Sequence, residues 1–449
     1  MPNELIISVS GLRGIVGESL TPEVAVRYAK AFAASIEAGP VVLARDGRTT
    51  GGMLTSAICS ALQACGRDVL LADVAATPTV GVLVRQRHAA GGMQVSASHN
   101  PPPYNGIKLF GPDGRVLAAT KGQVIKDKYL RNEGAWGSWE QVGTATKCDE
   151  TIKAHSKLVC EQVPVEAIRA KRFKVVLDAN HGAGAVLGKQ LLESLGCQVT
   201  VLGEEPNGRF IHPPEPTQEN LVSVGEKVRA AGAAIGFCVD PDADRLAIID
   251  EGGSYLGEEY TLALCLDYSL QTRKGTVVIN CATSRMCEDV AKRHGCQILR
   301  SAVGEANVCD LMISKQAVFG GEGNGGPIDP KVGNVRDSFV GMSVLLAAMA
   351  STGKSVSQLA ATIPTYAIVK TKVDMSTARL SDAMTAIAAK YPEAESNMLD
   401  GLRLQWPDAW LLVRGSNTEP IVRAIAEAPT RVRAETLCEE AGKILRLYQ

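Results

Sequence analysis

The hydrophobic pattern of the chain repeats three times. Each repeat has an apolar run that predicts a buried strand, a turn containing Gly or Ser, an amphipathic helical stretch, a Gly-Cys or Cys-Gly corner and a second apolar run. The first runs begin at Val41, Lys174 and Thr276, and the second runs begin at Val69, Val199 and Ile298. Each repeat predicts a βαβ unit with parallel strands and a right-handed crossover. Three such units predict three similar α/β domains with mixed, mostly parallel sheets, rather than one large sheet.

The pattern changes in the C-terminal part. Residues 366–373 alternate like a half-buried strand, residues 382–390 have a helical pattern, and two further strand-like runs follow at 402–406 and 409–413. A final amphipathic helix starts near Arg433. This part predicts an α+β domain. The expected domains are therefore 1–150, 151–252, 253–365 and 366–449.

Composition narrows the class of protein. A chain of 449 residues is too long for one core. With 45% apolar and 21% charged residues it has the balance of a soluble globular enzyme. The formal net charge of −1 gives no reason to expect nucleic acid or an anionic membrane as a partner. The start of the chain lacks a signal-peptide pattern, and the twelve cysteines include no Cys-x-x-Cys pair. We expect a cytoplasmic protein with reduced thiols.

One segment, Val-Ser-Ala-Ser-His-Asn-Pro at 95–101, offers a nucleophile. Ser98 lacks the flanking glycines of the elbow that carries acyl-transferring serines, which favours a phosphate as its partner. The prolines that follow and the Asn105-Gly106 pair fix an irregular loop, with Lys108 just beyond it. An ordinary polar surface turn has the same composition, so this segment alone leaves both interpretations open.

A second segment, Asp-Pro-Asp-Ala-Asp-Arg at 240–245, collects three carboxylates at alternate positions. Such carboxylates repel one another unless a cation lies between them. An EF-hand is excluded because its sixth position, which should be Gly, is Arg245, and a strand pattern follows at once. A tight loop between two strands leaves an ion open to outside ligands, which suits Mg²⁺. The alternative is a solvated acidic turn.

Two further segments have the composition of ligand-binding loops. Residues 414–420 read Arg-Gly-Ser-Asn-Thr-Glu-Pro, with Arg423 close behind, and this donor set suits a phosphate. Residues 320–326 contain five glycines that let backbone approach a ligand, with Glu322 and Asn324 able to bind sugar hydroxyls. A capped hairpin turn and a flexible loop are the respective alternatives.

These four segments together, in this order, resemble the α-D-phosphohexomutase family over nearly the whole chain. The resemblance implies four domains around a central cleft, a serine that is phosphorylated in the resting enzyme, and a sugar phosphate as the small-molecule substrate. It implies a Mg²⁺ ion held by Ser98, Asp240, Asp242 and Asp244. It implies sugar contact by Glu322 and phosphate contact by Arg414, Ser416, Asn417, Thr418 and Arg423.

The catalytic roles implied by the resemblance lie near the serine. Lys108 would carry a proton, provided that burial lowers its pKa toward neutrality. Arg13 matches the family arginine that points toward the phosphoserine, Arg245 would steady the same group, and His99 would make a structural or phosphate contact. Many relatives also have a histidine in the sugar loop. This chain has none there, so the partner of Lys108 in proton transfer stays open.

The expected reaction moves a phosphoryl group from Ser98 to a hexose monophosphate and returns the other phosphate of the bisphosphate to Ser98, with hexose 1,6-bisphosphate as activator. The sugar loop and residues 303–308 look most like archaeal-type phosphoglucosamine mutases. A phosphoglucomutase/phosphomannomutase of broad specificity is the main alternative. A serine phosphatase and a non-catalytic sugar-phosphate binder are the others. Further candidate substrate contacts are Thr283, Ser284 and Arg285. Monomer and homodimer both remain open.

Overall fold

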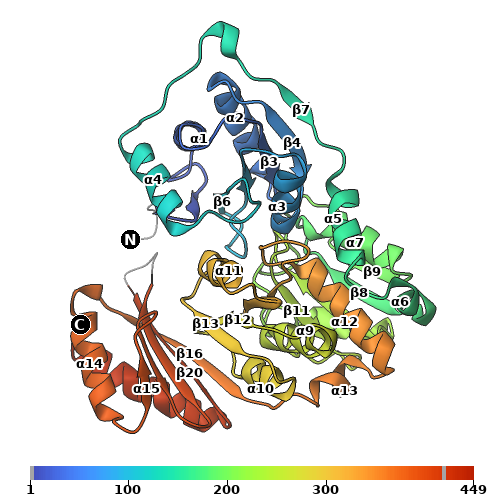
Figure 1. Cartoon of the computed structure of the whole chain (residues 1–449), viewed down its shortest axis with the longest axis vertical. Coiled ribbons are helices and arrows are strands. Elements are labelled where there is room, and N and C mark those ends of the chain that lie inside the picture. The colour runs from blue at the N-terminus through green and yellow to red at the C-terminus, as the bar shows by residue number, and fades with distance from the viewer. Residues whose placement is uncertain (1–4, 417–420) are drawn as a thin grey trace.

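The computed structural model describes residues 5–416 and 421–449. In Figure 1 the first domain lies at the top and the fourth at the lower left, while the second and third overlap at the lower right. The first α/β domain is built on a seven-stranded sheet in the order β1-β2-β6-β5-β3-β4-β7. Its elements are β1 (Ile6–Ser8), β2 (Gly11–Ile15), α1 (Pro22–Ala33), β3 (Val41–Arg45), α2 (Gly51–Ala64), β4 (Val69–Val74), α3 (Thr77–Gln86), β5 (Gly91–Val95), β6 (Tyr104–Phe110), α4 (Ala119–Leu130) and β7 (Ala145–Lys147).

The second and third α/β domains each have a four-stranded sheet. The second contains α5 (Thr151–Cys160), α6 (Val165–Lys171), β8 (Lys174–Asp178), α7 (Gly184–Ser194), β9 (Gln198–Leu202), α8 (Val222–Ala230), β10 (Ile235–Val239) and β11 (Leu246–Ile249). The third contains α9 (Glu258–Thr272), β12 (Val277–Asn280), α10 (Met286–Arg293), β13 (Ile298–Ser301), α11 (Glu305–Ser314), β14 (Phe319–Glu322), β15 (Gly326–Ile328), α12 (Ser338–Thr352) and α13 (Val356–Ala360).

The fourth domain is an antiparallel sheet in the order β16-β20-β19-β18-β17, packed against helices. Its elements are β16 (Ala367–Asp374), α14 (Leu380–Lys390), β17 (Glu395–Asn397), β18 (Leu402–Gln405), β19 (Trp410–Gly415), β20 (Ile421–Ala428) and α15 (Arg431–Arg446). Its own apolar core includes Leu411, Val413 and Leu437. The predicted change from α/β to α+β architecture is confirmed.

The three predicted repeats are confirmed, and they share one sheet topology. In each, the first strand (β3, β8 or β12) is flanked by two parallel strands, and a fourth strand returns antiparallel to the third. The central strands are buried along nearly their whole length because helices cover both faces, which explains their continuous apolar runs. The turn from the third strand to the fourth therefore lies at the carboxyl edge of every sheet.

The second and third domains are joined by a common core. Helix α12 packs on α9 of its own domain and also on α5, α6 and α7 of the second domain (Figure 1). Asp337 caps its N-terminus by accepting hydrogen bonds from the backbone N–H groups of Phe339 and Val340. Phe339, fully buried, lies in the same apolar cluster as Leu177 and Leu191 of the second domain. The two domains therefore form one packing unit.

The described residues contain no helix with the length and apolar character that a membrane crossing requires. All twelve cysteines lie in the described residues and are free thiols, most of them buried. The burial of these thiols agrees with their position inside apolar segments of the sequence.

Phe339→Ala should destabilise the second and third domains together, by about 3–5 kcal/mol, because the cavity would open at their shared core. Thermal and denaturant unfolding, followed by far-ultraviolet circular dichroism, measures this loss of stability. Val432→Ala is the control: Val432 is 73% exposed, so its removal should change stability by less than about 0.5 kcal/mol. Loss of the third domain alone, with the second still folded, would contradict a common core.

Candidate active site

The three sequence-predicted loops of the α/β domains occupy equivalent positions in the fold. Residues 96–103 join β5 to β6, residues 240–245 join β10 to β11, and residues 323–325 join β14 to β15. Each turn contains a residue with left-handed backbone: Ser98 (φ 50°), Ala243 (φ 54°) and Gly325 (φ 79°). The carboxyl edge of an open α/β sheet is the usual place for ligands. The repeated topology thus places the serine loop, the aspartate loop and the glycine-rich loop at equivalent turns of the three sheets.

Ser98 is held against the aspartate loop of the second domain. Its side chain is buried, and its Oγ donates to Asp240 Oδ2 at 2.6 Å. The His99 Nδ1 atom lies 3.3 Å from the same Oγ. A non-glycine residue in the left-handed region is strained and is commonly found at functional sites. The serine is therefore fixed with its hydroxyl toward the carboxylate cluster.

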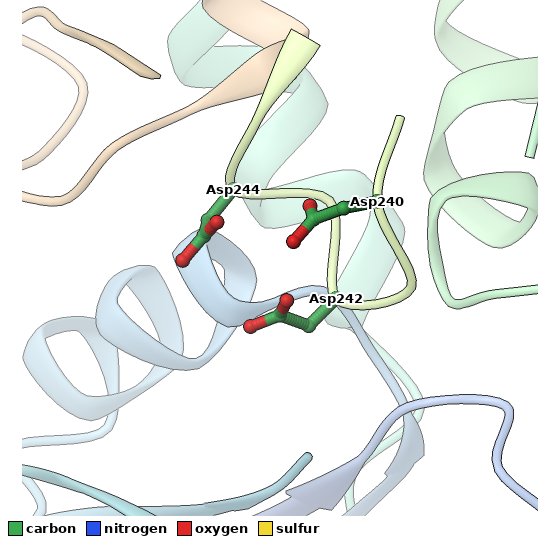
Figure 2. A group of neighbouring side chains, drawn as sticks. All are labelled: Asp240, Asp242 and Asp244. Atoms are coloured by element: carbon green, nitrogen blue, oxygen red, sulfur yellow. The ribbon is translucent and has the colours of Figure 1, made fainter. Parts of the chain in front are cut away.

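The three aspartates form a buried cluster. Figure 2 shows Asp240, Asp242 and Asp244 on one turn with their carboxylates facing a common space, and one oxygen of each lies within 4.8 Å of the others. Asp242 accepts from Thr77 Oγ1 of the first domain at 2.5 Å, and Asp244 accepts from Arg336 Nη2 of the third domain at 2.7 Å. The Oδ1 atoms of Asp242 and Asp244 are buried without a hydrogen-bond partner. Buried oxygens of this kind fit a hard divalent cation.

Lys108 on β6 reaches this cluster. Its Nζ donates to Asp242 Oδ2 at 2.6 Å and to Asp244 Oδ2 at 2.7 Å. Burial acts to lower the pKa of Lys108, but the two carboxylates outweigh burial and raise it. The condition that burial lowers this pKa toward neutrality, on which proton transfer by Lys108 depends, is therefore not met in this arrangement. Lys108 is held as an ammonium ion.

The pKa values of the carboxyl groups in this cluster are shifted in opposite directions. Burial raises the pKa of Asp240 well above its usual range, and the charges of Asp242 and Asp244 add to that rise. Burial also acts to raise the pKa of Asp242, but the Lys108 ammonium reverses the effect and the pKa falls. Asp240, which faces Ser98 rather than Lys108, is thus the least compensated carboxylate.

Two arginines surround His99. The charge of Arg245, followed by burial and the charge of Arg13, lowers the pKa of His99 to about 2. The imidazole is therefore neutral at physiological pH. Arg13 on β2 donates to Asn100 Oδ1 at 2.5 Å, which places a cation beside the serine loop. Arg245 sits at the end of the aspartate turn, where its backbone N–H donates to Asp240 Oδ1 at 3.2 Å.

Arg336 joins the aspartate loop to the glycine-rich loop at 320–326, and sequence reasoning missed it. Besides donating to Asp244, its Nη1 lies 3.1 Å from Glu322 Oε2, and its backbone N–H donates to Glu305 Oε1 at 2.7 Å. Burial raises the pKa of Glu305 to about 7, against the opposing charge of Arg336. The only local signal was the neighbouring Asp337, a capping residue before an apolar helix, and it says nothing about the partners of Arg336.

The sugar-loop residues are partly engaged by the protein. Glu322 Oε1 accepts from Asn280 Nδ2 at 2.7 Å and from the Gly304 backbone N–H at 3.0 Å. The Oδ1 atom of Asn324 is buried without a hydrogen-bond partner. An orphaned acceptor that lines a cleft can bind a ligand hydroxyl.

All four domains line one cleft of about 620 Å³. Eight of the predicted site residues line it: Arg13, Ser98, His99, Lys108, Arg245, Glu322, Asn324 and Arg423. The three aspartates lie directly behind this lining, in contact with Ser98 and Lys108. The cleft has a predominantly cationic wall, although the whole chain is nearly neutral.

The structure does not bring every predicted residue into this cleft. Arg285 donates from Nη2 to Pro407 O at 2.7 Å and lies over the Tyr366 ring, between the third and fourth domains. Thr283 Oγ1 accepts from the Gly323 backbone N–H at 3.0 Å, and the Ser284 backbone N–H donates to Glu259. These residues support the sugar loop and the domain contact from behind.

The predicted phosphate loop lies in the fourth domain. Arg414 on β19 and Arg423 on β20 face one another across the antiparallel pair. Arg414 is buried, with its Nε 2.9 Å from Asp400 Oδ2, and the Ser416 backbone N–H donates to Ile421 O. Asn417 and Thr418 lie outside the described residues.

The chain matches family models along its length. The descriptions are phosphoglucomutase/phosphomannomutase alpha/beta/alpha domain I at residues 5–135, domain II at 153–253, domain III at 258–366, and the C-terminal domain at 371–443.

Individual proteins match over the same extent. A phosphoglucomutase/phosphomannomutase of Thermococcus kodakarensis is 35% identical over 445 residues, which cover 97% of each chain. A Methanopyrus kandleri protein described as "Probable phosphoglucosamine mutase" is 32% identical over 441 residues, again 97% of each. A crystal structure of a phosphoglucomutase/phosphomannomutase family protein from Burkholderia thailandensis superimposes with a TM-score of 0.85 at 26% identity, covering 99% of this chain and 97% of that one.

Asp240→Asn should separate two effects of the carboxylate cluster: the loss of stability that its charges cause, and the binding of a divalent cation. Because the folded-state pKa of Asp240 is raised, its ionised form destabilises the fold at neutral pH, so the variant should have a higher thermal midpoint than wild type in chelator. Mg²⁺ or Mn²⁺ should raise the thermal midpoint of wild type, and this increase should be largely lost in Asp240→Asn. The affinity of the variant for the divalent ion should be at least about 10-fold lower. Differential scanning calorimetry with and without metal measures both effects.

Asp267→Asn is the matched control, because Asp267 is paired with Arg293 and His294 away from the cleft. It should keep the metal-dependent rise of wild type. An Asp240→Asn protein that is stabilised by divalent ions as strongly as wild type would exclude a metal site at this turn.

Proposed function

The chain belongs to the phosphoglucomutase/phosphomannomutase family and is a phosphohexomutase, and on this premise we propose how its cleft works. A phosphohexomutase is an intramolecular phosphotransferase, and this one interconverts hexose 6-phosphate and hexose 1-phosphate. The carrying observation is the pairing of Ser98 Oγ with Asp240 at 2.6 Å on one wall, with Arg423 of the fourth domain on another wall of the same cleft. One wall carries the reacting phosphate and the other grips the idle one.

In the proposed reaction Ser98 begins as a phosphoserine. The free hydroxyl of a hexose monophosphate attacks its phosphorus, the bond from phosphorus to Ser98 Oγ breaks, and a hexose 1,6-bisphosphate forms. The proton that the attacking hydroxyl loses ends, in net balance, on Ser98 Oγ. The bisphosphate then reorients in the cleft, so that its other phosphate faces Ser98. That phosphoryl group returns to Ser98, and the isomeric monophosphate leaves. Added hexose 1,6-bisphosphate would restore phosphate to a serine that had lost it, which is the role of an activator.

The charged residues around Ser98 suit a phosphoryl group. Arg13, Arg245 and Lys108 place three cations at the serine end of the cleft, where they would neutralise the charge that spreads over the transferring oxygens. Lys108, held as an ammonium ion by Asp242 and Asp244, is suited to neutralise phosphoryl charge rather than to carry a proton. The neutral imidazole of His99 can accept or donate one hydrogen bond beside the phosphate without adding charge.

Asp240, Asp242, Asp244 and a phosphate oxygen on Ser98 would hold a Mg²⁺ ion. The unpartnered Oδ1 atoms of Asp242 and Asp244 and the poor compensation of Asp240 support this assignment. When bound, the ion would supply charge neutralisation and act as a Lewis acid toward the phosphoryl oxygens. Thr77 and Arg336 orient two of the carboxylates from neighbouring domains.

The idle phosphate would bind at the fourth domain. Arg414 and Arg423 are register partners on neighbouring strands, and Arg423 also lines the cleft, so guanidinium groups that can bind a phosphate lie at this end of the sheet. We assign phosphate contacts to Arg414, Ser416, Asn417, Thr418 and Arg423. Because Arg423 and Ser98 line the same cleft from different domains, this site can hold either phosphate of the sugar while the other one reacts.

For the sugar we propose glucosamine phosphate as the preferred substrate, read by Glu322 and Asn324. Support comes from the archaeal relatives named "Probable phosphoglucosamine mutase" and from the carboxylate of Glu322 and the free Oδ1 of Asn324 in the cleft. Broad phosphoglucomutase/phosphomannomutase specificity is the alternative, favoured by the Thermococcus kodakarensis relative. Arg285, which does not line the cleft, would act only through the domain contact.

Several expectations from the sequence stay predictions. They are the domain limits 1–150, 151–252, 253–365 and 366–449, a cytoplasmic location, a monomeric or homodimeric state, and partners limited to small sugar phosphates without nucleic acid or membrane.

A substrate panel tests the proposed reaction. Enzyme, Mg²⁺ and a bisphosphate activator are incubated separately with glucosamine 6-phosphate, glucose 1-phosphate and mannose 1-phosphate, and products are separated by ion chromatography. We expect isomerisation of all three with the highest kcat/KM for the amino sugar. Higher kcat/KM for glucose or mannose phosphate would favour the broad-specificity alternative. Steady release of inorganic phosphate without isomerisation would contradict the mutase reaction.

Ser98→Ala should abolish isomerisation and the phosphoprotein together. Intact-mass spectrometry of wild type incubated with hexose 1,6-bisphosphate should detect one added phosphoryl group, and Ser98→Ala should remain unmodified. Ser96→Ala keeps the reacting hydroxyl and should still take up phosphate. Phosphate retained by Ser98→Ala would place the phosphorylated residue elsewhere.

Arg423→Gln should weaken substrate binding more than it slows the chemical step. Loss of one charge-assisted hydrogen bond worth about 1.5–3 kcal/mol predicts a rise in KM of roughly 10- to 150-fold in both directions of the reaction. Steady-state kinetics from each isomer measures the effect. Arg433→Gln is the control, because Arg433 pairs with Asp408 on the surface of the same domain. A loss confined to one direction would contradict a site that serves both phosphates.

A further inference from the structure

Arg48, in the turn between β3 and α2, binds the backbone of the serine loop. It is almost fully buried, and its guanidinium donates to four carbonyl oxygens of residues 98–104. The Nη2 atom donates to Ser98 O at 2.7 Å and to Asn100 O at 2.5 Å. The Nη1 atom donates to Pro101 O and to Tyr104 O, each at 2.9 Å. All four terminal N–H groups are used.

The other side of this arginine is tied to the amide of the serine itself. Asp46 lies 3.3 Å from Arg48 Nε, and its Oδ1 accepts from the Arg48 backbone N–H at 2.9 Å. The Oδ2 atom of Asp46 accepts from Ser96 Oγ at 2.6 Å, and that Oγ accepts from the Ser98 backbone N–H at 2.9 Å. Arg48 and Asp46 therefore hold Ser98 by both its N–H and its carbonyl.

The second domain covers this arginine. The Arg48 guanidinium lies 5.2 Å from the centre of the Phe210 ring. Gly208 approaches so closely that a Cβ there would lie 2.6 Å from Arg48 Cα and from Gly47 O. The arginine therefore connects the serine loop with the domain that carries the aspartates.

We propose that Arg48 is a positioning residue, which holds the loop 96–104 in the conformation that directs Ser98 Oγ at Asp240 and keeps phosphoserine in transfer rather than hydrolysis. A lysine cannot replace it, because one ammonium centre has three donors and cannot span four carbonyls. The left-handed backbone of Ser98 is sparsely populated in a free chain, so it needs such contacts to persist. The second half of this proposal rests on the phosphoserine reaction proposed above.

The test compares Arg48→Lys with wild type by three measurements. Hydrogen–deuterium exchange of peptides covering 96–104 should be faster by about 10-fold or more, since the carbonyl contacts that restrain the loop are lost. Phosphoserine prepared with hexose 1,6-bisphosphate and freed from sugar should be hydrolysed at least about 10-fold faster. The kcat should fall by about 10-fold or more with KM changed far less, because the idle phosphate site is untouched.

Arg67→Lys is the matched control. Arg67 also donates to three backbone carbonyls of the first domain, those of Ala33, Ile36 and Glu37, and it does not line the cleft. It should leave loop exchange and phosphoserine lifetime at wild-type values. If Arg48→Lys does not fold, Ser96→Ala replaces it, because it cuts only the link from Asp46 to the Ser98 amide and should shift all three measurements in the same direction by a smaller factor.

The outcomes separate this proposal from the proposed reaction. Unchanged exchange in loop 96–104 of the folded variant would overturn the positioning role, whether or not the enzyme is a mutase. Faster exchange with an unchanged ratio of transfer to hydrolysis would overturn the protective role. Wild type that never gains phosphate would refute the proposed reaction, while the exchange measurement would still decide whether Arg48 holds the loop.

Discussion

The mutual repulsion of three buried carboxylates is the constraint that the arrangement of domains has to satisfy. Two unit charges about 4 Å apart near a protein surface interact by about 4 kcal/mol, while a folded domain is stable by only about 5–15 kcal/mol. Asp240, Asp242 and Asp244 cannot lie this close without positive charge and hydrogen-bond donors from elsewhere. The first domain provides Ser98, Thr77 and Lys108, and the third provides Arg336. The need to compensate one turn thus brings separate domains into contact.

The repeated topology explains why these contributions can meet. In each α/β domain the third strand ends at the same edge of the sheet, and its turn to an antiparallel fourth strand requires one left-handed residue. That requirement fixes the backbone and leaves the other side chains of the turn free to differ. The first turn therefore carries Ser98, the second a carboxylate cluster and the third a glycine-rich sequence, with Glu322 at the end of the preceding strand.

The sequence could predict a feature where the residues that form it lie close together along the chain, and could not where they lie far apart. Apolar runs predicted the strands of the repeats because the central strands are buried on both faces, and contiguous motifs predicted Ser98 and the aspartate loop. Thr77 and Arg336 carry no local signal, since their partners lie 165 and 92 residues away.

The same limitation explains two expectations about single residues. Burial of Lys108 could be foreseen, but not the carboxylates 134 and 136 residues further on, so the sequence could not show that its pKa is raised rather than lowered. Arg285 follows a strand at the edge where ligands bind, yet the fourth domain covers it there. Both cases depend on contacts between domains, which no local pattern records.

The fourth domain is tied to the sugar loop by two neighbouring backbone groups. The Val303 N–H donates to Asp400 Oδ2 of the fourth domain at 2.9 Å, and the next N–H, that of Gly304, donates to Glu322 at 3.0 Å. Asp400 also pairs with Arg414, which faces Arg423 across the sheet. Beside these polar contacts, a buried apolar cluster joins Cys281 of the third domain to Trp410, Leu412 and Ile425 of the fourth. Any rotation of the fourth domain must therefore either carry the 303–304 turn with it or break its bond to Asp400, so the positions of Arg414 and Glu322 are not independent.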